Sequence, residues 1–175
     1  CKGCPHVESL GFVQEAMATF PDGRVFSDIG CYALGLLPPI ELEGTCVNMG
    51  SSITMAKGFR DAGLGPSVAV IGDSTFAHSG MTALLDAVFE QTSITVVILD
   101  NGTVAMTGWQ SSPVAGKIDR ICEGLGVDRG QIRTLVPLAC NHDSNVVQLR
   151  EALAYEGVSV IIAQRECVHG EGAKR

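Results

Sequence analysis

The sequence predicts a doubly wound α/β fold with a mostly parallel sheet of about six strands. Short apolar runs, rich in β-branched residues, alternate along the chain with segments of helical length. The strongest runs, residues 67–71 and 94–99, show no polar alternation. Uninterrupted apolar runs of this kind are typical of parallel strands that are covered by helices on both faces.

The predicted elements follow one another in a regular order. A first helix is expected over residues 6–20, with Pro5 suited to its first turn. The expected strands are residues 24–27, 45–48, 67–71, 94–99, 131–136 and 158–163. The other expected helices are residues 51–62, 80–90, 117–125 and 144–155. No repeat, low-complexity tract or linker interrupts this order, so residues 1–175 are expected to form one domain. Because the chain begins at Cys1 without an initiator Met, we interpret it as a piece of a larger enzyme.

The composition argues against nucleic acid and against a membrane as partners. Of the 175 residues, 46% are hydrophobic and 18% are charged, and the net charge is −7. Lys and Arg do not cluster as they do on surfaces that bind nucleic acid or anionic lipid. No apolar run reaches the ~18–20 residues that span a bilayer. The seven cysteines are odd in number and favour intracellular thiols over a disulfide framework, so a cytoplasmic location is expected.

Polar turns follow four of the predicted strands. In a doubly wound sheet, ligands bind beyond the carboxyl ends of the strands, so these turns are the expected site. They are rich in Gly, Ser, Thr, Asp and Asn, which supply oxygen ligands and free backbone amides for a metal-bound phosphate. The four turns are residues 28–31, 49–52, 72–75 and 100–103.

Asp73 and Asn101 stand directly after the two strongest predicted strands. Consecutive strand ends can bring them together, and a carboxylate, an amide oxygen, a backbone carbonyl and phosphate oxygens form the octahedral oxygen shell that Mg²⁺ prefers. The alternative is structural, with Asp73 capping a helix and Asn101 forming a turn. Neither the glycine-rich dinucleotide motif nor the P-loop motif occurs in the chain.

These residues resemble a known motif. The order Gly72-Asp73-Ser74, helix, strand and Asn101 resembles the thiamine-diphosphate motif. The wider sequence resembles the thiamine-diphosphate-binding domain of the 2-oxoacid:ferredoxin oxidoreductases, and within that family it is most similar to the alpha subunits of the indolepyruvate enzymes. The resemblance extends from Cys1 to Cys167 and rests on residues 1–6, 27–32, 72–80 and 99–108.

The resemblance implies a set of cofactor ligands. Mg²⁺ would be held by Asp73, Asn101 and the carbonyl of Thr103. Trp109 stands where the family has His, which is expected to alter the substrate pocket. The other residues that the resemblance assigns to the cofactor are Asp28, Gly30, Cys31, Gly50, Ser51, Gly72, Ser74, Thr75 and Thr107.

The cysteines suggest a second centre. Cys1 and Cys4 have the Cys-x-x-Cys spacing of a metal or redox site, and Cys31 and Cys167 each follow a predicted strand. The resemblance implies that these four thiolates hold a [4Fe–4S] cluster. A zinc ion would use the same ligands, and Cys140 competes with Cys167 as the fourth.

The resemblance also implies a reaction. A 2-oxoacid, with indolepyruvate or another aryl pyruvate favoured, would be oxidatively decarboxylated to an acyl-CoA, with electrons passed through the cluster to ferredoxin. No catalytic residue is certain, but His78 and His6 are candidates; each is equally compatible with a structural role.

The activating Glu of thiamine enzymes comes from a pyrimidine-binding domain, for which 175 residues leave no room. We therefore expect half an active site and an oligomeric assembly with a pyrimidine-binding partner. The alternatives are a thiamine decarboxylase or synthase domain without redox chemistry, and a non-catalytic cofactor-binding module.

Overall fold

The computed structural model describes residues 1–42 and 44–170, and it confirms the α/β prediction. Five parallel strands form the main sheet in the order β1-β2-β3-β7-β6. The predicted class and the parallel register therefore both hold. The strands are β1 (Arg24–Phe26), β2 (Ser67–Gly72), β3 (Thr95–Asp100), β7 (Ser159–Gln164) and β6 (Ile132–Leu135).

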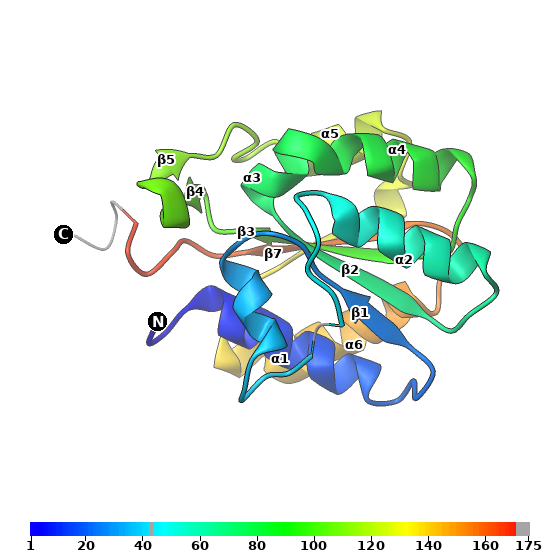
Figure 1. The fold of residues 1–175 in the computed structure, drawn as a ribbon, viewed down its shortest axis with the longest axis horizontal. Coiled ribbons are helices and arrows are strands. Elements are labelled where there is room, and N and C mark those ends of the chain that lie inside the picture. The colour runs from blue at the N-terminus through cyan, green and yellow to red at the C-terminus, as the bar shows by residue number, and fades with distance from the viewer. Residues whose placement is uncertain (43, 171–175) are drawn as a thin grey trace.

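Helices cover both faces of this sheet (Figure 1). One face carries α1 (Pro5–Met17) and α6 (His142–Leu153). The other carries α2 (Ser51–Asp61), α4 (Met81–Phe89) and α5 (Ile118–Gly124). Short helical turns complete the chain: α3 (Asp73–Thr75), η1 (Cys31–Leu36), η2 (Phe76–Gly80), η3 (Ala105–Thr107), η4 (Arg129–Gln131) and η5 (Ala139–Asn141).

The central strands explain why the sheet needs two helical layers. In β2, Val68 and Val70 pack against α1 and α6, whereas Ala69 and Ile71 pack against α2 and α4. Every residue of β2 and β3 is buried, so both faces must be covered. Full burial of one large aliphatic side chain contributes about 1.5–3 kcal/mol, and these two strands supply several.

Residues 45–48 differ from their prediction as a strand. They make one parallel bridge, between Ser27 and Cys46, and then leave the sheet. The reason is that β1 is three residues long and the chain must turn at Gly50 to begin α2. The main sheet consequently has five strands and not six. A small antiparallel hairpin, which the apolar pattern of the sequence does not predict, is formed by β4 (Thr103–Val104) and β5 (Gln110–Ser111).

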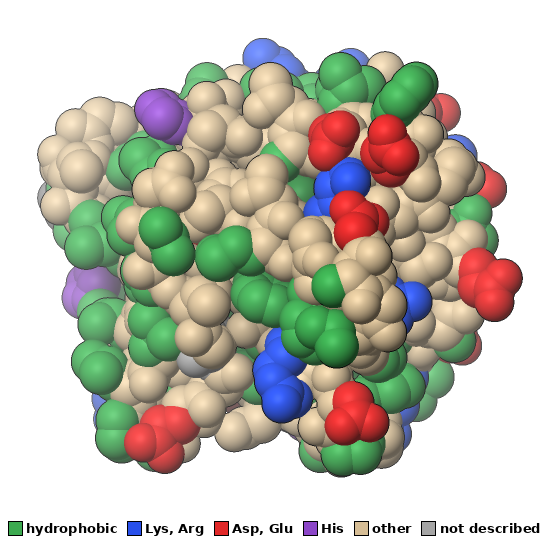
Figure 2. Space-filling model, turned by 45° about the vertical axis from the view of Figure 1, so that its right-hand side comes forward, with side chains coloured by type: hydrophobic (Ala, Val, Ile, Leu, Met, Phe, Trp, Pro, Cys, Tyr) green, Lys and Arg blue, Asp and Glu red, His purple; other side chains and the backbone are tan. Residues whose placement is uncertain are grey.

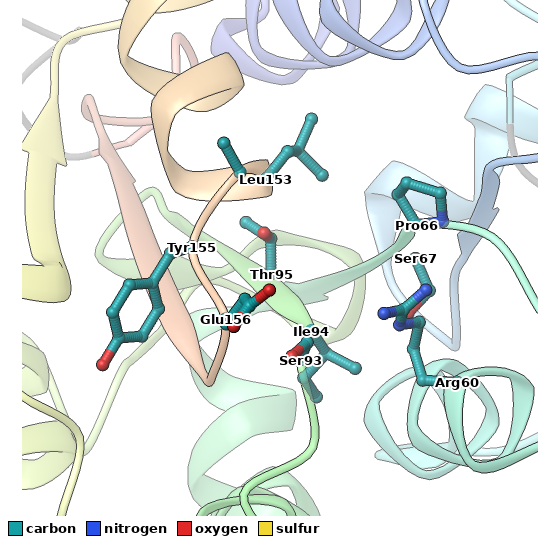
Figure 3. A pocket seen from close by; sticks show the side chains of 10 residues that line it. Arg60, Pro66, Ser67, Ser93, Ile94, Thr95, Leu153, Tyr155 and Glu156 are labelled. Atoms are coloured by element: carbon teal, nitrogen blue, oxygen red, sulfur yellow. The ribbon is translucent and has the colours of Figure 1, made fainter. Parts of the chain in front are cut away.

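The amino edge of the sheet holds a small cavity of about 100 Å³ where β2 and β3 begin (Figure 3). Its polar groups largely serve the fold: Arg60 donates a hydrogen bond to the carbonyl of Leu64, and the Ser67 hydroxyl donates to the carbonyl of Ala56. None of the predicted site residues lines it. The predicted site therefore lies away from this cavity, at the carboxyl edge of the sheet.

Across the part of the chain that the structure describes, no helix has the length and hydropathy needed to cross a membrane.

Candidate cofactor site

The carboxyl edge of the sheet brings the two predicted motif residues together. Gly72 and Leu99 are register partners in β2 and β3, so Asp73 and Asn101 leave the same edge of neighbouring strands. A cleft of about 200 Å³ opens beside them. Most of the predicted site residues line it: His6, Gly30, Cys31, Gly72, Asp73, Ser74, Thr75, Asn101, Thr103 and Thr107.

Asp73 is a buried carboxylate with an incomplete set of partners. Its side chain is 3% exposed, and Oδ1 accepts the Ser74 amide at 2.7 Å. Within residues 1–42 and 44–170, no hydrogen-bond donor reaches Asp73 Oδ2, and the buried Ser74 hydroxyl also has no partner. A helix cap would instead accept an amide two or three residues further on, so the capping alternative does not describe this geometry. Two unpartnered polar groups on residues that line one cleft are suited to binding a cation and its anion.

Burial raises the pKa of Asp73 to about 6, and the charge of Asp100 raises it further. The Ser74 amide and the nearby Ser112 hydroxyl favour the charged form and offset part of this effect. A buried charge without a full set of partners destabilises the fold, and a bound cation would remove that cost.

Asn101 is held at both ends of its amide. Oδ1 accepts the Thr103 amide at 3.2 Å, which makes the turn that the structural alternative proposes. Nδ2 lies 3.3 Å from Nε2 of His6. Because a carbonyl oxygen has two lone pairs, the turn leaves Oδ1 with capacity for a metal ion. The ring of His6 also packs edge-on against Tyr32, and burial lowers the pKa of His6 to about 4.

The helical run after β2 begins earlier than the sequence predicts. It starts at Asp73, continues through the π-helical turn η2 and then becomes α4, whereas the predicted helix begins at residue 80. A π turn widens the helix and often occurs at functional sites. His78 lies on the exposed side of this turn and contacts Ser79 rather than the cleft.

Asp28 lies behind the cleft. It is fully buried and accepts hydrogen bonds from the Tyr32 hydroxyl, the Gly50 amide at 3.0 Å and the Ser52 hydroxyl at 2.7 Å. Its carboxylate thus fixes the start of α2 and the position of Tyr32. Gly50 and Ser51 line an adjoining open cleft of about 370 Å³, which shares Met49 with the first one.

Gly50→Ala is expected to lower the free energy of unfolding by about 1–3 kcal/mol. Gly50 has φ of +86°, and an added Cβ would collide with the Ser79 hydroxyl, whose donation to Met49 joins this turn to η2. The matched control is Gly58→Ala in α2, where a Cβ meets nothing within 4 Å; it should gain about 0.5–1 kcal/mol. Denaturant titration of both variants checks this. A Gly50→Ala protein as stable as its parent would contradict the close approach.

Tyr32 and Ser112 belong to the site although sequence reasoning assigned them no role. Tyr32 is 3% exposed and packs on Gly72, where a Cβ would lie 2.8 Å from the ring; a Cβ on Gly30 would also collide with it. Glycine is therefore required at both positions. Tyr32 lies in residues 27–32, one of the segments on which the family resemblance rests, so the sequence did offer a reason to assign it to the site. Ser112 follows the unpredicted hairpin, and nothing in its sequence context indicates Asp73 as a neighbour.

Cys31 lies within electrostatic range of two other predicted cluster cysteines. Burial raises the pKa of Cys31, and its interactions with Cys4 and Cys167 raise it further. Cys140 is exposed, where its thiol contacts Asn141. Within residues 1–42 and 44–170, no set of three or more His, Cys, Asp or Glu side chains has a metal-ligating arrangement. The thiols are neighbours, but they do not form a ready ligand set.

Exposed apolar side chains stand on segments next to the cleft. Met106 lines the cleft and is 69% exposed. Leu34, at 67%, follows the cleft residue Cys31 in η1, and Val47, at 66%, precedes the cleft residue Met49 in the sequence. Figure 2 shows one face of the molecule, on which hydrophobic side chains are interspersed with acidic and basic ones and two histidines lie at the left. Trp109 lines an adjoining cavity of about 240 Å³ that shares Asn101 and Thr103 with the cleft, and it packs edge-on against His169; its effect on the substrate pocket stays a prediction. An apolar surface of this kind is typical of one that another protein segment covers.

Comparisons with known proteins agree with this geometry. The family model described as thiamine pyrophosphate enzyme, C-terminal TPP binding domain, matches residues 28–163. The indolepyruvate oxidoreductase subunit IorA of Archaeoglobus fulgidus is 35% identical over 178 residues, which cover 95% of this chain and 28% of the relative. The subunit of the same name from Methanothermobacter marburgensis is 36% identical over 190 residues, covering 100% of this chain and 30% of the relative.

Solved structures share the fold. The 2-oxoglutarate:ferredoxin oxidoreductase from Magnetococcus marinus superimposes with a TM-score of 0.83 at 18% identity, over 98% of this chain and 65% of that one. The thiamine diphosphate-dependent 4-hydroxybenzoylformate decarboxylase of Rhodococcus jostii gives 0.65 at 18% identity, over 94% and 33%. At these identities the likeness concerns the fold alone. The chain spans less than a third of the length of the curated relatives that it matches.

Proposed function

Because this chain belongs to the family of thiamine pyrophosphate enzyme C-terminal TPP-binding domains, we propose that it binds thiamine diphosphate through Mg²⁺ within a 2-oxoacid oxidoreductase. The proposed substrate is indolepyruvate or another aryl pyruvate, in line with the names of the relatives. The observation that carries the proposal is the pair of buried, unpartnered groups, Asp73 Oδ2 and the Ser74 hydroxyl, at the carboxyl edge beside Asn101; both lie within the part of the chain that the structure describes.

The residues present fit this cofactor. Asp73, Asn101 and the carbonyl of Thr103 would hold Mg²⁺, since all three are hard oxygen ligands. The Ser74 hydroxyl would donate a hydrogen bond to the diphosphate, and Thr75, whose hydroxyl donates to the carbonyl of Ile29, would donate through its backbone amide at the start of the helical run. Tyr32, with its hydroxyl bonded to Asp28, would form a rigid wall of the cleft and limit access of water.

Thiamine diphosphate, when bound, supplies a nucleophilic carbon that attacks the ketone of a 2-oxoacid and accepts the electron pair left by departing carbon dioxide. The contribution of this chain is to hold the diphosphate and to fix the cofactor in place. His6 and Thr107 line the same cleft and would contact the cofactor or its substrate. His78 stays a candidate only if the exposed face of η2 meets another part of the assembly.

We further propose that Cys1, Cys4, Cys31 and Cys167 bind a [4Fe–4S] cluster as one unit. The interaction of Cys31 with both Cys4 and Cys167 supports this proposal, and it favours Cys167 over the exposed Cys140 as the fourth ligand. The arrangement within residues 1–42 and 44–170 is not yet a ligand set, so no electron-transfer step is assigned to these thiols.

The proposed setting is an assembly in the cytoplasm, in which the chain forms one domain. The relatives are named as subunits, and the apolar surface around the cleft supports a covering partner. That partner would be a pyrimidine-binding domain or subunit that supplies the activating Glu. Ferredoxin and coenzyme A would serve as electron and acyl acceptors.

The isolated chain is expected to bind thiamine diphosphate only in the presence of Mg²⁺ and to show no oxoacid-dependent reduction of ferredoxin. Calorimetric titration, with and without a chelator, measures the first; anaerobic assay with indolepyruvate measures the second. Thiamine without phosphates is the control ligand and should not bind at comparable concentration. Equal affinity in the chelator would refute the metal site. Robust ferredoxin reduction by this chain alone would refute the half-site.

A further inference from the structure

The amide of Asn101 is the one proposed magnesium ligand whose two ends differ chemically. Its Oδ1 can bind a cation, whereas its Nδ2 carries two hydrogens and no lone pair for a metal. A rotation of the amide by half a turn would exchange the two. Something in the structure must therefore select the orientation that presents oxygen to the cleft.

We propose that His6 is a positioning residue that locks the Asn101 amide in its metal-binding orientation. The inference rests on the proposed function, since it requires Asn101 to be a magnesium ligand. It assigns a role to a buried histidine on α1 through its contact with Asn101, a residue 95 positions away in the sequence.

Two contacts carry the argument. The Thr103 amide is a donor, so the atom that faces it at 3.2 Å must be Oδ1. Nδ2 then faces Nε2 of His6 at 3.3 Å, and because Nδ2 can only donate, this ring nitrogen must accept. His6 therefore carries its proton on Nδ1. A flipped amide would set Nδ2 against the Thr103 N–H and lose that hydrogen bond, and it would also lose the bond to His6 as long as the ring keeps its proton on Nδ1.

The surroundings of His6 hold the ring in place. It is 8% exposed, it lies on the first turn of α1 after Pro5, and it packs edge-on against Tyr32 at 6.3 Å between ring centroids. A partner that fixes the orientation of a metal ligand typically changes metal affinity by about 10–100-fold when it is removed. His6 should therefore act on cofactor affinity through Asn101.

A double-mutant cycle on the full chain tests this, with affinity for thiamine diphosphate in Mg²⁺ as the readout. His6→Leu should weaken binding about tenfold or more. His6→Gln should restore most of the affinity, since its Oε1 can accept from Nδ2. In an Asn101→Asp background both side-chain oxygens can bind a metal, so His6→Leu should have little further effect. Ser9→Ala, which removes a buried hydrogen bond on the same helix, should leave affinity unchanged.

A second measurement needs no cofactor. Nitrogen NMR of the histidine rings should show His6 as the Nδ1–H tautomer in the parent chain. The Nε2–H tautomer would overturn the inference. An equal loss on His6→Leu in the parent and in the Asn101→Asp variant would also overturn it, because packing alone would then explain the effect. If the parent chain binds no Mg²⁺–thiamine diphosphate while His6 is the Nδ1–H tautomer, the proposed function fails, and the contact by which His6 fixes the Asn101 amide has only a structural role.

Discussion

Asp73→Asn is expected to abolish magnesium-dependent binding of thiamine diphosphate and, at the same time, to stabilise the cofactor-free protein at pH 8. Asp73 is 3% exposed, and one of its carboxylate oxygens has no donor among residues 1–42 and 44–170. The negative charge of Asp73 favours metal binding but destabilises the folded state. A neutral amide of the same shape removes the charge that Mg²⁺ requires and also removes the desolvation cost.

The pH dependence follows from the direction of the pKa shift. Burial raises the pKa of Asp73 from its ordinary 3.8 to about 6, so between these values the folded state binds more protons than the unfolded state. This group's contribution to stability therefore falls as pH rises through that window. The gain from Asp73→Asn should be about 1–3 kcal/mol at pH 8 and should vanish near pH 4.

Chemical denaturation at pH 4 and pH 8 in a chelator measures this difference. Asp100→Asn is the matched control, because both of its carboxylate oxygens already have donors, the Gly102 amide and the Gln164 side chain. Asp100→Asn should destabilise the protein at pH 8, with the opposite sign to Asp73→Asn. Loss of stability in both variants would show that Asp73 is an ordinary structural carboxylate.

The fold could be predicted because the apolar pattern and the topology agree. Residues 67–71 and 94–99 became the fully buried centre of the sheet, since an apolar run with no polar face must be covered twice. The family resemblance is also confirmed. Residues 45–48 carry a strand-like pattern, but they form a single bridge, to Ser27, which directly follows the short edge strand β1. Local propensity does not contain that tertiary restriction.

Only the site residues that stand at or directly after the end of a strand could be predicted from the sequence. Gly72, Asp73 and Asn101 stand at such ends, so the sequence indicated that they meet. Contacts between segments far apart in sequence could not be found in this way. The contact between Asn101 and His6 joins the end of β3 to α1, and the position of Ser112 near Asp73 depends on a hairpin that no periodicity marks.

The helix start at Asp73 was missed for a related reason. Asp73, Ser74 and Thr75 are weak helix formers in a helix interior, so residues 73–79 resemble a loop. In the structure the run is helical because Phe76 is fully buried against the sheet and Gly80 allows close contact with Ile71. Packing outweighs propensity here, so the helical run begins beside the cleft.

The second large effect is expected at Cys31. Among the four proposed cluster ligands, it alone lines the cofactor cleft within the part of the chain that the structure describes, and it lies near both Cys4 and Cys167. Anaerobic reconstitution with iron and sulfide should give a brown protein with about four irons per chain, and Cys31→Ala should reduce iron incorporation to background. Folding around a metal supplies binding energy that the metal-free arrangement lacks, so the ligand set can form on loading.

Cys140→Ala is the matched control, because Cys140 is exposed and has no role in the preferred assignment. Its iron content should equal that of the parent, whereas Cys167→Ala should lose the cluster. If the two variants behave in the reverse way, the fourth ligand is Cys140, and η5, not the segment after β7, supplies it. If the parent takes up one zinc and no iron under the same conditions, the four thiols form a structural site and the redox assignment fails. Iron analysis together with the absorption spectrum separates these outcomes, because zinc thiolates are colourless and a [4Fe–4S] cluster is not.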